Sequence, residues 1–185
     1  MSFWSRFGYS VSESAAVPVP CEVMWNLVRD FERYPEFCSG VQAVEPLPDE
    51  RGFTVETLRI GAEFRRRLVV GSKENEYVDS HVTIIQLDND DGNFPRSFSI
   101  YADDFAQRLS CRITWTVQPS KDGNDECELT IFSTILPKRC CLCLGGRRLC
   151  VPVWRFPALS SELLRRDLQD FSRAAVAAFD KNLNE

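Results

Sequence analysis

Residues 17–37 read VPVPCEVMWNLVRDFERYPEF, and this stretch decides the fold. Pro18 and Pro20 end an extended segment and favour a helix start, since proline is tolerated in the first turn of a helix. An apolar stripe then recurs at helical spacing as far as Phe31, which predicts one short helix. At the end of this helix lie three aromatic residues, Phe31, Tyr34 and Phe37, with a proline at position 35, before any sheet begins, and the rest of the chain has to explain why.

The composition bounds the class of protein. A chain of 185 residues, 44% of them hydrophobic, is long enough for one domain with a sizeable core and an internal cavity. The net charge of −5 offers no basic excess for phosphates, so we expect no nucleic-acid partner. No apolar run reaches the roughly 18 residues of a membrane span. The first residues lack the apolar core of a secretory signal, so the expected location is cytoplasmic.

Alternating apolar and polar residues predict an antiparallel meander. The expected strands cover residues 9–17, 41–47, 53–60, 63–70, 78–87, 97–103, 109–118 and a last one from 127 to 136. Residues 53–60 and 63–70 are interpreted as a hairpin, with Gly61 at the first central position of a type II′ turn. Its inner face is apolar far from the turn and carries Arg59 and Arg66 near it.

The C-terminal segment has helical periodicity instead. Its apolar residues recur every three or four positions and predict a long helix over about 160–183, with Ser160 or Ser161 as its cap. The stripe consists of Leu163, Leu164, Leu168, Phe171, Ala175, Ala178 and Phe179. The expected fold class is therefore α+β, with a curved antiparallel sheet of six to eight strands wrapped around this helix and two short helices after the first strand.

This order of elements resembles the START-like superfamily, also called SRPBCC or helix-grip proteins. The resemblance is carried by residues 17–37, by 53-FTVETLRIG-61 and by 162-ELLRRDLQDFSRAAVAAF-179, and its most specific part is Asp30 followed by Tyr34-Pro35-Glu36-Phe37. The most similar branch is the polyketide cyclase/dehydrase and coenzyme Q-binding group. We expect a single START-like domain over 1–185 with a tail at 1–7. Residues 137–158 depart from the family pattern, because they are longer than its usual link into the last helix, and they are interpreted as a lid-like loop.

The resemblance also explains the opening stretch. In this superfamily two short helices form a V against which the long helix rests, and Pro35 turns the chain because it drives the preceding residue from helical geometry. Tyr34 and Phe37 are then either scaffold or ligand contacts. Side chains facing the cavity are the expected ligand-binding residues: Tyr34, Phe37, Phe64, Arg66, Leu68, Ile100, Ile113, Trp115, Ile131, Phe171 and Ala175.

Residues suited to catalysis are few. His81 is the single histidine, and no nucleophile pattern accompanies it, so we expect no catalytic set, metal or cofactor. Isolated cysteines within apolar patterns are interpreted as small core residues: Cys21, Cys38, Cys111 and Cys127. Glu13, Arg59 and Arg66 are interpreted as inward-facing charges, which either lie at the sheet edge near water, or hold a polar ligand head or act in acid/base work.

The loop before the last helix is basic and apolar, although the protein as a whole is acidic. Cys140 and Cys143 have the spacing of a metal or redox pair, but a second pair of zinc ligands is missing. The alternatives are a plain lid and peripheral membrane contact through 137–157, made firmer by acylation of its cysteines. The residues expected to contact the membrane are Arg139, Arg147, Arg148, Trp154 and Phe156.

Three functions stay open at this point. The first is a carrier or chaperone that binds a lipid, sterol, quinone or polyketide-like molecule between sheet and helix, which needs only an apolar concavity and few polar groups. The second is a polyketide cyclase/dehydrase-type enzyme, which needs a positioned acid and base inside the cavity. The third is a co-chaperone-like protein-interaction module. A shared fold does not decide among them.

Overall fold

The structure is a computed structural model that describes residues 9–48, 59–69, 77–88, 93–104, 109–121, 126–137 and 156–183. Within these ranges a first strand leads into three short helical segments, further strands and one long helix. The elements are β1 (Tyr9–Val17), α1 (Cys21–Arg29), η2 (Phe31–Arg33), α2 (Tyr34–Phe37), β2 (Val41–Pro46), β3 (Glu63–Val69), β4 (Tyr77–Leu87), β5 (Arg96–Asp104), β6 (Leu109–Pro119), β7 (Cys127–Pro137) and α3 (Phe156–Leu183). Tyr34 has helical backbone angles, φ −52° and ψ −36°, so the prediction that Pro35 drives it from helical geometry is wrong, and Pro35 lies in the first turn of a short helix.

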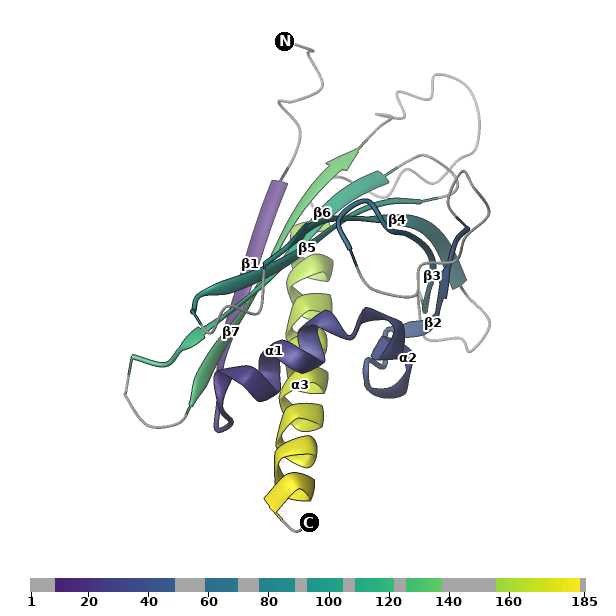
Figure 1. Ribbon diagram of the computed structural model, residues 1–185. Helices are drawn as coiled ribbons and strands as arrows, with labels where there is room; N and C mark the ends of the chain where they lie inside the picture. Colours follow the sequence, from purple (N-terminus) through teal and green to yellow (C-terminus); the bar gives the residue numbers. More distant parts are fainter. Residues whose placement is uncertain are drawn as a thin grey trace, which may run out of the picture.

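The described strands form one seven-stranded antiparallel sheet in the order β1-β7-β6-β5-β4-β3-β2. The first strand pairs with the last along its whole length, from Tyr9 opposite Ile135 to Val17 opposite Cys127. The remaining strands follow one another as a meander, and β2, β3 and β4 curl around at the side remote from β1 (Figure 1). The predicted curved antiparallel sheet with a long C-terminal helix is confirmed.

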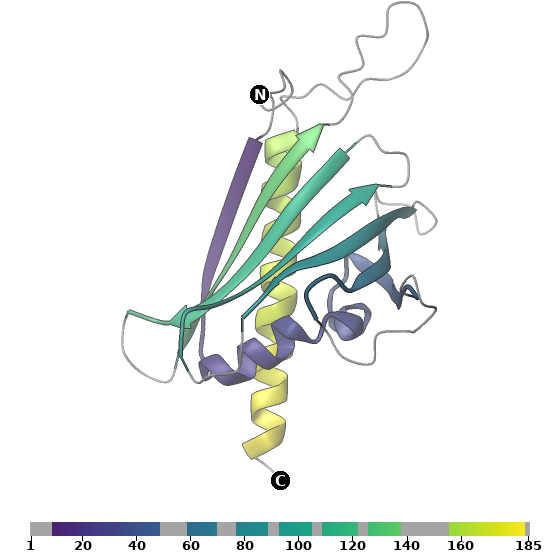
Figure 2. The same cartoon turned by 45° about the horizontal axis from the view of Figure 1, so that its top comes forward.

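The long helix α3 lies against one face of this sheet, and its C-terminal end extends past α1 (Figures 1 and 2). Its backbone packs most closely against β1 and α1, with lighter contacts to α2 and β7. The middle strands therefore face α3 mainly across a layer of side chains. Among the helices described, none has both the length and the apolar composition that crossing a membrane requires.

Alternation along the strands separates the two faces of the sheet. On β7, Leu129 and Ile131 are fully buried on the inner face, which we define as the face toward α3, whereas Phe132, the next residue, is 40% exposed on the outer face. The outer face is otherwise largely polar, and hydroxyl groups pair across its strands, as at Ser14 and Thr130, whose oxygens are 2.8 Å apart. The inner face and α3 together enclose the hydrophobic core.

The predicted hairpin of residues 53–60 with 63–70 is wrong. β3 pairs with β2 on one side and with β4 on the other, so neither backbone edge is left for residues 53–60. Residues 53–58 themselves lie outside the described residues. The alternation correctly identified the inner face of β3, but an alternating pattern does not say which strand lies beside it.

The turn at Gly61 also differs in type from the prediction. The amide of Ala62 donates to the carbonyl oxygen of Arg59 at 3.0 Å, and Gly61 has a φ of 87°. Gly61 therefore occupies the second central position, where a type II turn requires positive φ, and not the first position of a type II′ turn. Beyond the turn Arg67 pairs with Asp79 of β4 at 2.7 Å.

The helix α3 begins at Phe156, earlier than the predicted start at residue 160. Pro157 lies in its first turn, where a missing backbone N–H costs nothing. Ser160 and Ser161 consequently lie inside the helix, and the prediction that one of them caps it is wrong. Part of the predicted stripe is exposed, namely Leu163 and Ala178. The buried part consists of Leu164, Leu168, Phe171 and Ala175.

Candidate functional site

All eleven side chains predicted to bind a ligand lie in the interior of the molecule. They come from α2, β3, β5, β6, β7 and α3. Those that are buried are Tyr34, Phe64, Arg66, Ile100, Trp115, Ile131, Phe171 and Ala175. Those that are partly buried against the core are Phe37, Leu68 and Ile113. The fold thus brings together residues that are far apart in the sequence.

The aromatic members form a packed wall at the end of the interior near α2. The Tyr34 ring contacts Phe171 edge-on, with centroids 5.1 Å apart, and Trp115 at 5.9 Å. Phe31 joins this wall to Phe64 of β3, with centroids 5.4 Å apart. The Tyr34 hydroxyl donates to the carbonyl oxygen of Val28 at 2.5 Å. Because that hydroxyl is engaged and the ring is 2% exposed, Tyr34 holds α1 and α2 together.

Two N–H donors on the inner face have no acceptor among the described residues. They are Nε of Arg66 on β3 and Nε1 of Trp115 on β6. Arg66 is 5% exposed and Trp115 is 3% exposed, so water reaches neither side chain freely. A buried donor without an acceptor costs free energy, and most buried polar groups in proteins are paired. These two donors therefore mark polar positions within an otherwise apolar interior.

Four charged residues surround the buried thiol of Cys38, at the end of α2. They are Arg66 of β3 with Arg166, Asp167 and Asp170 of α3, and each of them acts electrostatically on Cys38. We name these four residues the inner charge cluster. Burial is the largest cause that raises the pKa of the Cys38 thiol, so this cysteine stays protonated and is no nucleophile at neutral pH.

One member of the inner charge cluster is fully engaged in holding the fold. Asp170 is 4% exposed, and its carboxylate accepts hydrogen bonds from the Ser39 amide at 2.8 Å and the Ser39 hydroxyl at 2.7 Å. The guanidinium of Arg173 lies 3.5 Å from it. Asp170 therefore fastens α3 to the turn between α2 and β2. The guanidinium of Arg166 lies over Gly40 in the same turn, where a side chain on residue 40 would displace it.

Asp167 is the member whose protonation is unusual. Burial raises the pKa of its carboxyl from 3.8 to about 6, and the nearby guanidinium groups of Arg166 and Arg66 only partly offset this effect. No hydrogen bond joins Asp167 to Arg66 or Arg166 in the described structure. Asp167 keeps part of its surface exposed, and charged groups from β3 and α3 therefore act on each other here without a direct hydrogen bond.

Asp167 was not among the predicted site residues. Its place on the inward side of α3 follows from the helical repeat, because it lies three residues after Leu164 and four before Phe171. The sequence signal that could have identified Asp167 as a site residue is that it is ionisable and lies on an otherwise apolar stripe.

The other charges predicted to face inward have different surroundings. Glu13 of β1 pairs with Arg165 of α3 at 3.1 Å. Arg59 is exposed beside the Gly61 turn. The single histidine, His81, is 42% exposed, and its Nε2 lies 3.2 Å from the carboxylate of Glu63. Only Arg66 of the predicted set is both charged and buried on the inner face.

The cysteines within apolar patterns behave as small core residues. All four are free thiols, and Cys38 and Cys127 are buried, while Cys21 and Cys111 are partly buried. Burial raises the pKa of Cys127 to about 12. Within the described ranges, no group of three or more His, Cys, Asp or Glu side chains is placed to hold a metal ion.

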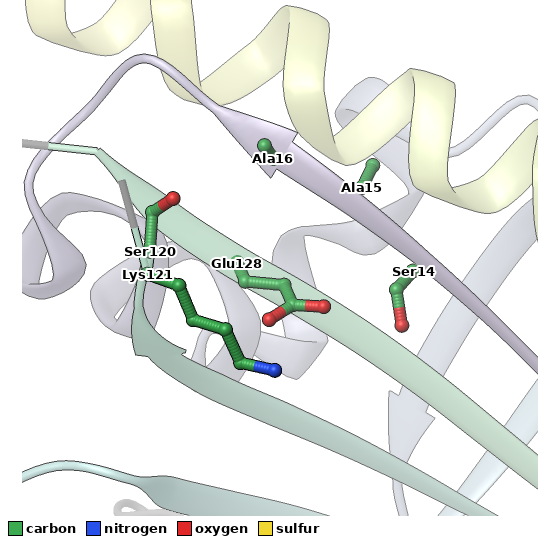
Figure 3. A pocket seen from close by; sticks show the side chains of 6 residues that line it. All are labelled: Ser14, Ala15, Ala16, Ser120, Lys121 and Glu128. Atoms are coloured by element: carbon green, nitrogen blue, oxygen red, sulfur yellow. The ribbon is translucent and has the colours of Figure 1, made fainter. Parts of the chain in front are cut away.

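A separate hollow lies where β1, β6 and β7 meet on the other side of the strands. Its volume is about 240 Å³, and it is lined by Ser14, Ala15, Ala16, Ser120, Lys121 and Glu128. Figure 3 shows Lys121, Glu128 and Ser14 extending to the same side of the strands, while Ala15 lies beside α3. The charged groups here are exposed or half-buried, so this hollow lacks the buried, unpaired donors of the interior.

Most residues predicted to contact a membrane lie outside the described ranges. Arg139, Arg147, Arg148 and Trp154 lie outside the described residues, as do the cysteines of the C-x-x-C segment, and only the backbone of Phe156 is described, as the first residue of α3. Membrane contact through 137–157 stays a prediction.

Comparison with solved structures identifies the fold. The ZhuI aromatase/cyclase from Streptomyces sp. R1128 superposes with a TM-score of 0.68 at 14% identity, covering 91% of this chain and 93% of that one. A START superfamily protein from Mycobacterium smegmatis gives 0.65 at 13% identity, with 91% and 98% covered. A point mutant of norcoclaurine synthase from Thalictrum flavum gives 0.59 at 13% identity, with 92% and 96% covered. At these identities the likeness establishes the fold alone.

Comparison of the sequence with family models is more specific. Residues 17–141, about two thirds of the chain, match the model described as polyketide cyclase / dehydrase and lipid transport. No curated protein sequence matches the chain. The matched region contains the short helices, all the strands after β1 and the buried Arg66 and Trp115. Membership of this family supports the interpretation that the fold binds a hydrophobic small molecule. The chain therefore belongs to the polyketide cyclase/dehydrase and lipid transport family of START-like proteins.

Proposed function

We propose that this protein is a carrier that holds a hydrophobic small molecule with a polar head between the sheet and α3. The classes we consider are lipids, sterols, quinones and polyketide-like compounds. One observation supports this most strongly, namely that Arg66 Nε and Trp115 Nε1 are buried donors that find no acceptor within the described part of the chain, in a largely apolar interior. A ligand that supplies an acceptor to such a donor removes a cost that the empty protein bears.

The apolar part of the ligand is assigned to the middle of the sheet. Ile100 and Ile113 are direct neighbours across β5 and β6, and Ile131 follows on β7. Ile113 is only partly buried, as is Leu68 of β3, so both keep surface that a ligand can cover. Ligand sites are usually apolar concavities with a few polar groups that orient the ligand. Arg66 is the group we assign to the ligand head.

Catalysis is the second candidate, and one observation favours it. An acid or base that works near neutral pH needs a pKa near that range, and the pKa of the Asp167 carboxyl is about 6. Perturbed carboxyl groups are concentrated at functional sites, but they also occur in structural ion networks. A cyclase/dehydrase-type reaction would then use Asp167 as the acid or base and Arg66 to stabilise negative charge on an oxygen.

The carrier proposal is tested by titration with N-phenylnaphthylamine, an uncharged apolar probe whose fluorescence rises in apolar surroundings. We expect saturable binding with one probe per chain and a change in the emission of Trp115. Ile113→Trp fills the inner face and should weaken binding by at least about ten-fold, because overpacking a filled site displaces the ligand. The matched control is Phe132→Trp, which adds the same side chain to the outer face of β7. Equal binding by both variants would contradict an interior site.

A further inference from the structure

We infer that Asp167 and Arg66 together select a ligand whose polar head is a neutral hydroxyl group. Arg66 donates a hydrogen bond to the hydroxyl oxygen, and the Asp167 carboxylate accepts the hydroxyl proton. The inference rests on the proposed function, because it names the class of ligand that the same interior takes. It assigns a binding role to Asp167, a residue of α3 outside the matched family region, which ends at residue 141.

The placement of the two groups carries the argument. Arg66 projects from the inner face of β3 and is 5% exposed, and its Nε has no acceptor. Asp167 lies on the inward side of α3, close enough for Arg66 to act on its carboxyl, yet no hydrogen bond joins them in the described structure. Asp167 shares its stretch of α3 with the buried Leu164, Leu168 and Phe171. A buried donor and a nearby acceptor that are not bonded to each other fit a group that accepts from one and donates to the other. A hydroxyl group does both.

The balance of charge favours a neutral head. The inner charge cluster holds two guanidinium groups, Arg66 and Arg166, and two carboxyl groups, Asp167 and Asp170. A neutral hydroxyl leaves this balance unchanged. A carboxylate head would place a further negative charge beside Asp167, and like charges at close range in a buried site repel strongly. An ammonium head would likewise be repelled, because it would place a further positive charge beside Arg66.

The surroundings of Asp167 also predict how pH changes the preference for a ligand with a hydroxyl head. The ionisable groups that face it are Arg66 from β3, Tyr34 and Cys38 from α2 and its end, and Arg166 and Asp170 from α3. Burial raises the pKa of Tyr34 and of Cys38, so both stay neutral at neutral pH. Asp167, with a pKa of about 6, is therefore the group that changes charge just below neutral pH. Its ionised form is the stronger acceptor, so the preference for a hydroxyl should decline as the pH falls below this value.

The experiment uses three competitors that share one apolar body, namely naphthalene, naphthol and naphthoate. Each displaces N-phenylnaphthylamine from the full-length protein at neutral pH, and the readout is the ratio of the dissociation constants of naphthalene and naphthol. In the parent protein we expect naphthol to bind about ten- to a hundred-fold more tightly than naphthalene, the range for a hydrogen bond to a charged group. Asp167→Leu should bring the ratio close to one, and Asp167→Asn should give an intermediate value.

The matched control is Glu162→Leu, which makes a similar change on the exposed side of the same helix and should keep the parent ratio. Tightest binding by naphthoate in the parent protein would overturn the inference, and so would a naphthol preference that survives Asp167→Leu. In either case the apolar probe still binds and the proposed function stands. If neither the fluorescent probe nor any competitor binds the parent protein, the proposed function fails and the inference fails with it.

Discussion

Arg96 and Arg66 are both buried arginines on the inner face of one sheet, two strands apart, but their surroundings differ. Arg96 of β5 is 2% exposed and contacts the Glu22 carboxylate of α1 through both terminal nitrogens at 3.2 Å. Its Nε donates to the carbonyl oxygen of Asn93 at 3.0 Å, and the guanidinium lies over the Phe94 ring at 4.4 Å. Arg66 of β3 has a Nε without an acceptor and faces Asp167 without a hydrogen bond.

This difference separates a structural charge from a candidate functional one. Around Arg96, hydrogen bonds and an aromatic face compensate for burial, and the result is that α1 is fastened to the sheet. Around Arg66, Nε finds no acceptor among the described residues, and the guanidinium acts on the Asp167 carboxyl without a hydrogen bond. Burial raises the pKa of that carboxyl, and the attraction to Arg166 and Arg66 lowers it only in part. The unpaired donor at Arg66 gives the fold no evident gain in stability, and this is consistent with a binding site beside it.

The largest expected effect on stability concerns the packed wall of aromatic side chains near α2. Phe171 is 1% exposed and contacts Tyr34 and Phe37 edge-on, with centroids 5.1 Å and 5.3 Å apart. Phe171→Ala should lower the free energy of unfolding by about 3–5 kcal/mol, because it leaves a cavity and removes aromatic contacts. Chemical denaturation measures this loss. A loss below about 1 kcal/mol would contradict the packing described for this wall.

A pair of identical substitutions tests the comparison directly. Arg96→Met removes the hydrogen bonds to Glu22 and Asn93 and should cost about 2–3 kcal/mol. Arg66→Met removes a charge with an unpaired donor and keeps most of the side-chain volume, so it should change stability by less than about 1 kcal/mol. Denaturation curves recorded under one set of conditions give both values. An equal cost at the two positions would erase the distinction between a paired and an unpaired arginine.

The effect expected at Asp167 is smaller than that of Arg96→Met and depends on pH. The pKa of Asp167 is 3.8 in the unfolded chain and about 6 in the folded protein, so the folded state binds more protons between these values. Stability contributed by this group therefore falls as the pH rises from about 4 to 6 and stays low above that range. Asp167→Asn removes the penalty and should stabilise the ligand-free protein by about 1–2 kcal/mol at neutral pH.

The same variant should show little advantage below about pH 4, where the carboxyl is protonated in both states. Thermal denaturation of the two proteins across this pH range measures the difference. Stabilisation that is equally large at acidic and neutral pH would point to a packing effect unrelated to the charge of Asp167.

Periodicity was sufficient to predict the fold because it reports which side of an element is buried. The alternation on β6 and β7 and the spacing of Leu164, Leu168 and Phe171 correspond to the observed inner face. Periodicity carries no information about which strands are neighbours, so residues 53–60 were paired with β3, although β2 and β4 occupy both of its edges.

The site was predicted only in part, for a different physical reason. The alternation of apolar and polar residues along the strands predicts which apolar residues lie on the inner face. Arg66 was recognised as an inward-facing charge because it occupies an apolar position in that alternation. Whether a buried charge finds a partner depends on distances between segments that are far apart in the chain, such as β3 and α3. The contrast between Arg96, paired with Glu22, and Arg66, facing Asp167, therefore emerges only in three dimensions.

The central claim is that a hydrophobic ligand enters the interior between the sheet and α3. The indole N–H signals of the tryptophans in a two-dimensional proton–nitrogen correlation spectrum test it most directly, with Trp115→Phe identifying the signal of Trp115. Trp115 Nε1 has no acceptor in the described structure, so we predict that its signal moves when naphthol or N-phenylnaphthylamine is added. Backbone signals of Ile113 and Ile131 should move with it. Those of Ser14 and Lys121, at the separate hollow where β1, β6 and β7 meet (the outer hollow), should stay in place. A Trp115 signal that stays fixed through saturation, with shifts confined to the outer hollow, would contradict the account.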